Sequence, residues 1–131
     1  MAKIKFNTLE YWKAVAEACN KDETYLQYCK ESTKPLNITL KLCQDNEKCF
    51  TMKFDNGKIV DVHESKPDEK ADAVATMNYE AMVKQHKGEK DMMYFLSHGQ
   101  AKLEGMMTFL TFAKPISQMM EVVAPKIPVE Y

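Results

Sequence analysis

This sequence of 131 residues lacks long apolar runs and a surplus of either charge, and each absence excludes a class of protein. No stretch approaches the roughly 20 apolar residues of a membrane span, and the first residues lack the apolar core of a signal peptide. Because 19 acidic residues balance 18 basic ones, no global field is available to hold nucleic acid or an anionic membrane. We therefore expect one soluble, cytoplasmic domain over residues 1–131, with no nucleic-acid partner and no integral membrane segment.

Motifs for metal binding and catalysis are also missing. No Cys-x-x-Cys pair, His-x-x-x-His spacing or Gly-x-Ser-x-Gly turn is present, so we expect no catalytic residue, no metal site and no cofactor. In a cytosolic protein the cysteines are expected to be reduced and mostly buried. An alternative for two of them is a disulfide, because Cys43 and Cys49 could face each other across a hairpin.

Glycine is scarce, and all four glycines fall where a chain reversal is expected. Three of them, Gly88, Gly99 and Gly105, punctuate residues 71–112, a segment crowded with methionine. Unbranched thioether side chains fill apolar space without dictating its shape, which favours an adaptable interior. Eight of the ten methionines lie in the C-terminal part of the chain, namely Met77, Met82, Met92, Met93, Met106, Met107, Met119 and Met120.

The spacing of apolar residues predicts a helical N-terminal region over residues 7–33. Asn7 with Glu10 three residues later is typical of a capping box, and an apolar stripe at helical spacing follows. Asn20 and Asp22 interrupt this stripe, so the region contains either a kinked helix or a second short helix.

From residue 36 the period changes to two, which predicts strands. Alternation of apolar and polar residues, broken by turn-forming segments, indicates a three-stranded antiparallel meander over residues 36–64. A strand-helix-strand-helix unit is predicted over residues 71–121, in which Asn78 and Asp91 begin helices. Pro115 either kinks the last helix or begins a new one in its first turn. One sheet covered by helices on one face is the simplest way to bury these stripes, so we expect an α+β fold.

The order of these elements, with the residues at their joints, resembles the sterol carrier protein 2 family, in particular its small stand-alone prokaryotic members. The resemblance is carried by Trp12, Asn20-x-Asp22-x-x-Tyr25, Phe54-Asp55-Asn56-Gly57-Lys58, Ala71-Asp72 and Gly99-x-x-Lys102-Leu103-x-Gly105. It implies a five-stranded, mostly antiparallel sheet with helices on one side. It also implies an apolar tunnel between the sheet and the C-terminal helices that binds acyl chains, acyl-CoA or sterols. Two residues depart from the family pattern near the mouth of that tunnel, Gln100 in place of lysine and His98 in place of glutamine.

We expect the tunnel wall to be drawn from apolar residues of the second meander strand and the methionine-rich segment, with ordinary core packing as the alternative for each of them. The candidates are Phe50, Met52, Phe54, Met82, Met92, Met93, Phe95, Leu96, His98, Gln100, Met106, Met107, Phe109, Leu110, Phe112, Met119 and Met120. Adjacent residues on a helix point about 100° apart, so one methionine of each neighbouring pair can be partly exposed.

The function expected from these features is non-enzymatic binding and carriage of a long apolar ligand, such as a fatty acid, acyl-CoA or a sterol-like lipid. The alternative is an interaction module that docks a partner enzyme or forms a homodimer through exposed apolar residues. The histidines are expected to be solvated or locally hydrogen-bonded. The lysines at positions 84, 87 and 90 could attract an anionic headgroup or simply form a solvated loop.

Overall fold

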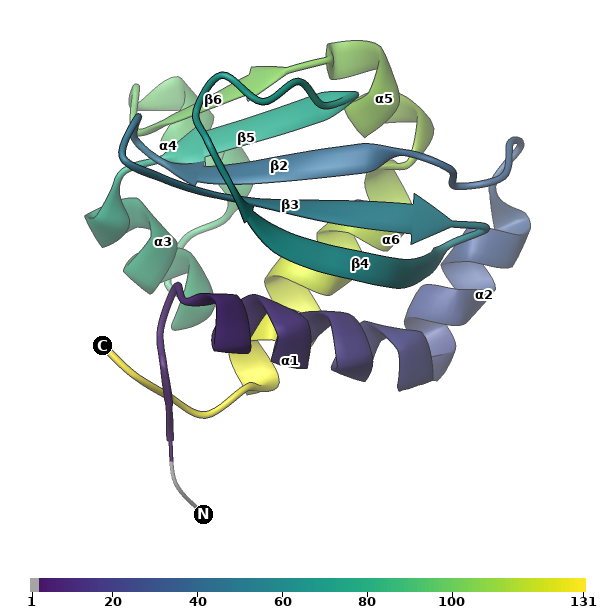
Figure 1. The fold of residues 1–131 in the computed structure, drawn as a ribbon, viewed down its shortest axis with the longest axis horizontal. Helices are drawn as coiled ribbons and strands as arrows, with labels where there is room; N and C mark the ends of the chain where they lie inside the picture. Colours follow the sequence, from purple (N-terminus) through teal and green to yellow (C-terminus); the bar gives the residue numbers. More distant parts are fainter. Residues whose placement is uncertain (1–2) are drawn as a thin grey trace.

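Five strands form the central sheet of this chain, which a computed structural model describes over residues 3–131 (Figure 1). The strand order is β4-β3-β2-β5-β6. β2 and β5 are parallel, and the other neighbouring pairs are antiparallel. The expected five-stranded, mostly antiparallel sheet is therefore confirmed. Its strands are β2 (Thr39–Gln44), β3 (Lys48–Asp55), β4 (Lys58–Ser65), β5 (Ala73–Met77) and β6 (Ala101–Glu104).

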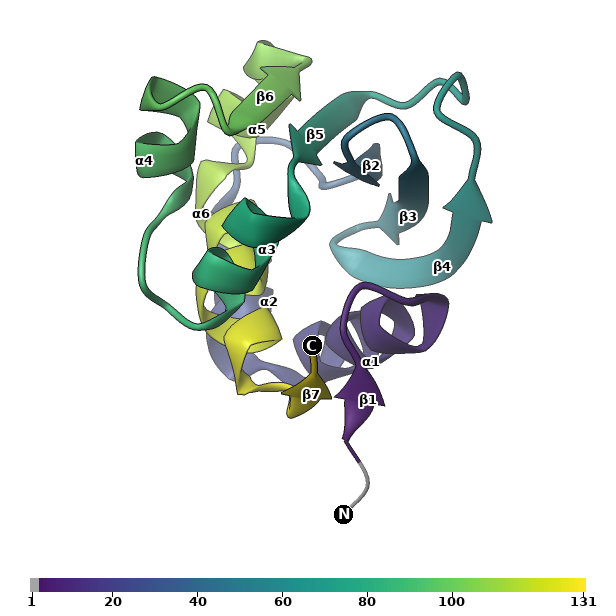
Figure 2. The same cartoon turned by 90° about the vertical axis from the view of Figure 1, so that its left-hand side faces the viewer.

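Helices lie on one side of this sheet, and the crossover from β4 to β5 passes over the other side (Figure 2). No helix among residues 3–131 is both long and apolar enough to cross a membrane. The α-helices are α1 (Leu9–Lys21), α2 (Glu23–Glu31), α3 (Tyr79–His86), α4 (Met92–Ser97), α5 (Met106–Thr111) and α6 (Ala113–Gln118). A π-helical turn, η1 (Met119–Val123), and a 3-10 turn, η2 (Ala124–Lys126), continue from α6.

The start of α1 differs from the predicted capping box. Thr8 is the N-cap and accepts a hydrogen bond from the backbone nitrogen of Tyr11 at 3.2 Å. Asn7 instead has a left-handed backbone, and its buried side chain accepts the indole N–H of Trp12 at 3.0 Å. The buried ring of Trp12 therefore takes the side chain that the sequence suggested as the cap.

The interruption at Asp22 separates two helices, so the second short helix is confirmed. Asp22 caps α2 by accepting the backbone N–H of Tyr25. The Tyr25 hydroxyl then donates to the carbonyl oxygen of Gly57 at 2.6 Å, which ties α2 to the turn between β3 and β4. In α1, the Asn20 side chain forms two hydrogen bonds with the backbone of Ile59 in β4. These bonds fix both N-terminal helices against one half of the sheet.

The C-terminal helices are short because the backbone breaks twice. Gly105, at φ 80°, begins α5, and a side chain there would collide with the backbone carbonyl of Asp72. Phe112 separates α5 from α6, and Pro115 lies in the first turn of α6, so a new helix rather than a kink is confirmed.

A second small sheet and a disulfide are also present, and neither was the leading prediction from the sequence. A second, two-stranded parallel sheet joins β1 (Ile4–Lys5) to β7 (Val129–Glu130), which holds the two ends of the described chain side by side. The sulfur atoms of Cys43 and Cys49 are in bonding contact across the β2–β3 hairpin. The disulfide alternative therefore describes this pair, whereas Cys19 and Cys29 are free thiols.

Candidate functional site

An apolar cavity of about 150 Å³ lies between one half of the sheet and the C-terminal helices. The sheet contributes four side chains to it, Leu40 and Leu42 from β2, Ala75 from β5 and Leu103 from β6. The helical side consists mainly of Met92, Phe109, Ala113, Ile116 and Met120. The cavity reaches the surface along α6, where Ala113 and Ser117 are exposed.

The cavity exists because a small residue lies between large ones. The register places Leu42, Ala75 and Leu103 side by side across β2, β5 and β6. Alanine projects only a methyl group from the sheet, so the helices above β5 have no side chain to pack against at that point. An interior that is elsewhere close-packed is therefore hollow at Ala75.

The size of the cavity limits what it holds in this conformation. An apolar cavity of about 150 Å³ binds a molecule such as benzene, and the volume corresponds to about five groups of the size of a water molecule. A long acyl chain needs a wall to move. The part of the wall with the fewest buried contacts is α5, because none of its residues is buried.

Comparisons with solved structures identify the fold in which this cavity lies. Neither a family model nor a curated protein matches the sequence. A crystal structure of sterol carrier protein 2 superposes with a TM-score of 0.78 at 14% identity, over 94% of this chain and 99% of that chain. A conserved hypothetical protein from Thermus thermophilus, suggested to be a sterol carrier protein, gives a TM-score of 0.76 at 14% identity, over 99% and 94% of the two chains. This chain has the sterol carrier protein 2 fold.

A third similar structure belongs to a protein that is named for a biosynthetic pathway. A UbiJ-SCP2 ubiquinone synthesis protein superposes with a TM-score of 0.57 at 9% identity, over 83% of this chain and 90% of that chain. Proteins with this fold therefore carry names that refer both to sterol carriage and to a biosynthetic pathway.

Three of the residues expected to line a sterol-carrier-type tunnel are at the cavity. They are Met92, Phe109 and Met120, one each from α4, α5 and η1. Sequence reasoning missed the floor, because it favoured β3 over β2, β5 and β6. The alternation of leucines in β2 and the alanine at position 75 were the available signals.

Most of the other expected residues are buried elsewhere in the core. Phe50 and Met52 lie on the same sheet face as the cavity floor, since they pair with Leu42 and Leu40, but they are one strand away from it. The further buried residues outside the cavity are Phe54, Met82, Phe95, Phe112 and Met119. Leu96 is half-buried and also lies outside it. In this structure none of these residues lines the cavity.

Four of the expected wall residues are exposed in this structure and do not line the cavity. Met93 and Met107 are 71% and 75% exposed, and Met106 and Leu110 are also exposed. In the pair 92–93, Met92 lines the cavity and Met93 is exposed, whereas in the pair 119–120 Met119 is fully buried and the half-buried Met120 lines the cavity. Both members of the pair 106–107 are exposed, because α5 ends at Thr111 and only Phe109 of this helix reaches the cavity.

The two residues that depart from the family pattern are also away from the cavity. His98 is exposed, its Nδ1 donates to the carbonyl oxygen of Tyr94 at 2.8 Å, and its ring stacks on Tyr94. Gln100 is half-buried and does not line the cavity. Among the nearby lysines, Lys84 pairs with Glu80 at 3.1 Å, and Lys87 and Lys90 lie over tyrosine rings.

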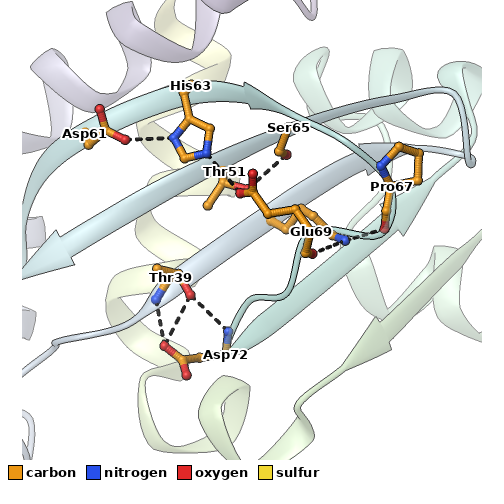
Figure 3. Close-up of polar contacts among 9 residues, drawn as sticks. Thr39, Thr51, Asp61, His63, Ser65, Pro67, Glu69 and Asp72 are labelled. Atoms are coloured by element: carbon orange, nitrogen blue, oxygen red, sulfur yellow. Dashed lines mark hydrogen bonds and ion pairs between the residues drawn. The ribbon is translucent and has the colours of Figure 1, made fainter.

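A polar cluster on the opposite face of the sheet is the other candidate site (Figure 3). His63 lies between two carboxylates, with Nδ1 at 2.7 Å from Asp61 and Nε2 at 2.9 Å from Glu69. These hydrogen bonds, first that to Asp61, raise the pKa of His63. The buried Lys41 ammonium donates to the carbonyl oxygens of Pro67 and Glu69, each at 2.6 Å. The cluster therefore ties the crossover from β4 to β5 to the sheet.

This cluster does not form a nucleophile pair. The Thr51 hydroxyl donates to Ser65 at 2.9 Å, and neither hydroxyl is hydrogen-bonded to His63. Burial raises the pKa of the Cys19 thiol to about 12, which keeps it protonated and unreactive. Within residues 3–131, no three or more His, Cys, Asp or Glu side chains are arranged so that they could hold a metal ion. The chemistry of the described residues thus favours the apolar cavity as the functional site.

Proposed function

We propose that this protein binds a long, mostly apolar ligand in the cavity beneath β2, β5 and β6 and carries it without changing it chemically. The ligand class is a fatty acyl compound or a sterol-like lipid. The observation that supports this proposal most is the cavity itself, which is apolar and lies between the sheet and the C-terminal helices of a sterol carrier protein 2 fold. Transfer of each methylene from water contributes about 0.8 kcal/mol, so an acyl chain enters such a site without a charged anchor.

Entry of a long chain requires α5 to move away from β5. Phe109 lines the cavity from this helix, whereas Met106, Met107 and Leu110 already face solvent. Displacement of α5 therefore exposes little additional apolar surface and enlarges the cavity. Methionines next to the opening can repack around chains of different shape, which predicts broad rather than strict selectivity.

The proposal is tested by filling the hollow at β5. In Ala75→Leu the added side chain occupies the cavity, and we expect the affinity for a fluorescent fatty acid to fall at least about tenfold, since several buried methylene contacts are lost. The folded state is expected to change in stability by less than about 1.5 kcal/mol. Fluorescence titration and urea unfolding measure the two quantities.

The matched control is Val74→Leu, which enlarges the neighbouring side chain on the opposite face of the same strand. Its affinity should equal that of the wild type. Native mass spectrometry of the purified protein should also detect a copurified lipid in the wild type and none in Ala75→Leu. Equal binding by wild type and Ala75→Leu would show that the ligand, if any, lies elsewhere.

A second candidate function is that of an accessory subunit, and the exposed apolar face of α5 supports it. Met106, Met107 and Leu110 are 48%, 75% and 63% exposed on one short helix. A contiguous apolar surface of this kind is typical of a contact with another protein. Light scattering distinguishes the possibilities, because a homodimer made by this face should dissociate in the double variant Met107→Gln, Leu110→Gln. A wild type that is monomeric at all concentrations excludes the homodimer.

A further inference from the structure

Gln85 is a polar residue in an apolar position. It lies in the last turn of α3, one helical turn after the fully buried Ala81, and is itself only 5% exposed. Positions four residues apart share one face of a helix, so Gln85 projects from the buried stripe of α3. It is one of the residues that line the cavity beneath β2, β5 and β6.

The side-chain nitrogen of Gln85 has no hydrogen-bond partner. Within residues 3–131 it is the single buried side-chain nitrogen or oxygen atom without one. The other buried polar side chains in this part of the chain, those of Asn7, Lys41, Thr51 and His86, all have partners. A buried amide N–H without an acceptor destabilises the fold, whereas methionine or leucine at this position would not. An acceptor brought within reach of this nitrogen, for instance by a molecule in the cavity that Gln85 lines, would remove that cost.

The charges around the cavity restrict the chemistry of that acceptor. Among residues 3–131, Glu121 is the only ionisable residue that lines the cavity, and no lysine, arginine or histidine of this part of the chain does so. A ligand carboxylate or phosphate placed at Gln85 would lose its water without gaining a cation, and Glu121 would repel it. An uncharged oxygen avoids both penalties and still accepts the amide N–H.

We propose that Gln85 donates a hydrogen bond from Nε2 to an uncharged oxygen, a carbonyl or a hydroxyl, on the ligand of this cavity. This inference rests on the proposed lipid-binding function and adds the ligand class. A long-chain ketone, ester or alcohol binds with its oxygen at α3 and its chain along β5 toward α5. The same chain ending in a carboxylate binds more weakly.

The test compares ligands of equal length on matched variants. Competition against a fluorescent apolar probe gives the affinities of 2-decanone, 1-decanol, decanoate and decane for the wild type, Gln85→Met and Gln27→Met. Methionine has nearly the shape of glutamine and no donor, and Gln27 is an exposed residue of α2 that provides the control for the substitution itself. We expect the wild type and Gln27→Met to prefer the ketone and the alcohol. We expect Gln85→Met to bind the ketone about tenfold more weakly and decane equally well.

A second measurement does not depend on a variant being well folded. The side-chain ¹⁵N–¹H₂ resonance of Gln85 in the wild-type protein should shift downfield on addition of 2-decanone and not on addition of decane. Equal losses for ketone and decane in Gln85→Met, or no loss for either, would overturn the inference and leave the proposed function standing. Failure of the wild type to bind any of the four ligands would overturn both.

Discussion

The two halves of one sheet face are packed in different ways. Beneath β3 and β4 the side chains of Trp12, Tyr25, Phe50 and Met52 are at most 1% exposed. Beneath β5 and β6, the short helix α5 has no buried residue, and a cavity takes the place of side chains. The half beneath β3 and β4 is therefore close-packed, whereas the half beneath β5 and β6 leaves space in which side chains and α5 can move.

The difference comes from residue size rather than from the apolar pattern. Both halves alternate apolar and polar residues along their strands, but β3 presents Phe50 and Met52 to the helices, whereas β5 presents Ala73 and Ala75. The large side chains of β3 fill the space beneath that strand, whereas the methyl groups of β5 leave space below the C-terminal helices. A sheet can therefore be rigid at one edge and adaptable at the other while its register is continuous.

The largest effect that would test this contrast is expected in the tightly packed half. Trp12→Ala removes a fully buried ring and leaves the Asn7 side-chain oxygen without its donor. We expect the free energy of unfolding to fall by about 3–5 kcal/mol, as for other buried aromatic residues. Urea unfolding followed by circular dichroism measures the change.

The matched substitution in the other half is Phe109→Ala. This ring is half-buried at the cavity, so its removal enlarges an existing space instead of creating a new one, and we expect a loss below about 2 kcal/mol. If the two variants lost equal stability, the halves would be equally packed and the contrast would be wrong.

Much of this contrast could not be predicted from the sequence. Period-two alternation correctly located the strands and the face they bury, and Asn78 and Asp91 were correctly predicted as helix caps. The strand order was not encoded in that pattern. A cavity floor at β3 and one at β2, β5 and β6 are equally compatible with the alternation, and only the parallel pairing of β2 with β5 decides between them.

The predicted capping box failed because the Asn7 side chain bonds to other side chains instead of to the backbone at the start of its helix. Asn7 fitted a capping box by its spacing, yet its carbonyl oxygen bonds the Trp12 indole and its amide donates to Gln44 at 2.7 Å. Pro115 signalled a kink or the start of a new helix, but the exposure of both Met106 and Met107 on the short helix before it was not predicted. Gln85 was not singled out from the sequence, although a glutamine interrupts the buried stripe of its helix there.

A smaller effect is expected from pH, since the buried imidazole of His86 packs against the aromatic rings of the N-terminal region. His86 contacts the rings of Phe6 and Tyr11, and its Nε2 donates to the carbonyl oxygen of Ile127 at 3.0 Å. Burial lowers the pKa of His86. The unfolded chain, with a pKa of about 6.5, therefore takes up a proton first, and stability should fall as the pH drops below that value. Urea unfolding at several pH values between about 5 and 8 measures the slope.

His63 supplies the opposite control on the outer face of the sheet. Asp61 and Glu69 raise its pKa, so its contribution to stability is complete below a pH of about 6.5 and is lost as the pH rises through the folded-state pKa. His86→Gln should remove the loss of stability below a pH of about 6.5, and His63→Asn should remove the gain in stability that His63 contributes as the pH falls toward that value from above. Identical slopes in both variants and the wild type would show that neither histidine titrates differently on folding.

The smallest effect is expected at the surface of the adaptable half. Met107 is 75% exposed on α5, so Met107→Gln should change the free energy of unfolding of the monomer by no more than about 0.5 kcal/mol. The matched control is Met119→Gln, which places an amide at a fully buried position and should cost at least about 2 kcal/mol.

A large loss in Met107→Gln would mean that α5 is packed against something in solution, either a second copy of the chain or the rest of the domain. Light scattering of the same variant separates these outcomes, because only a packed interface between copies changes the molar mass. A neutral result in a monomer would instead leave α5 as the movable wall of the cavity.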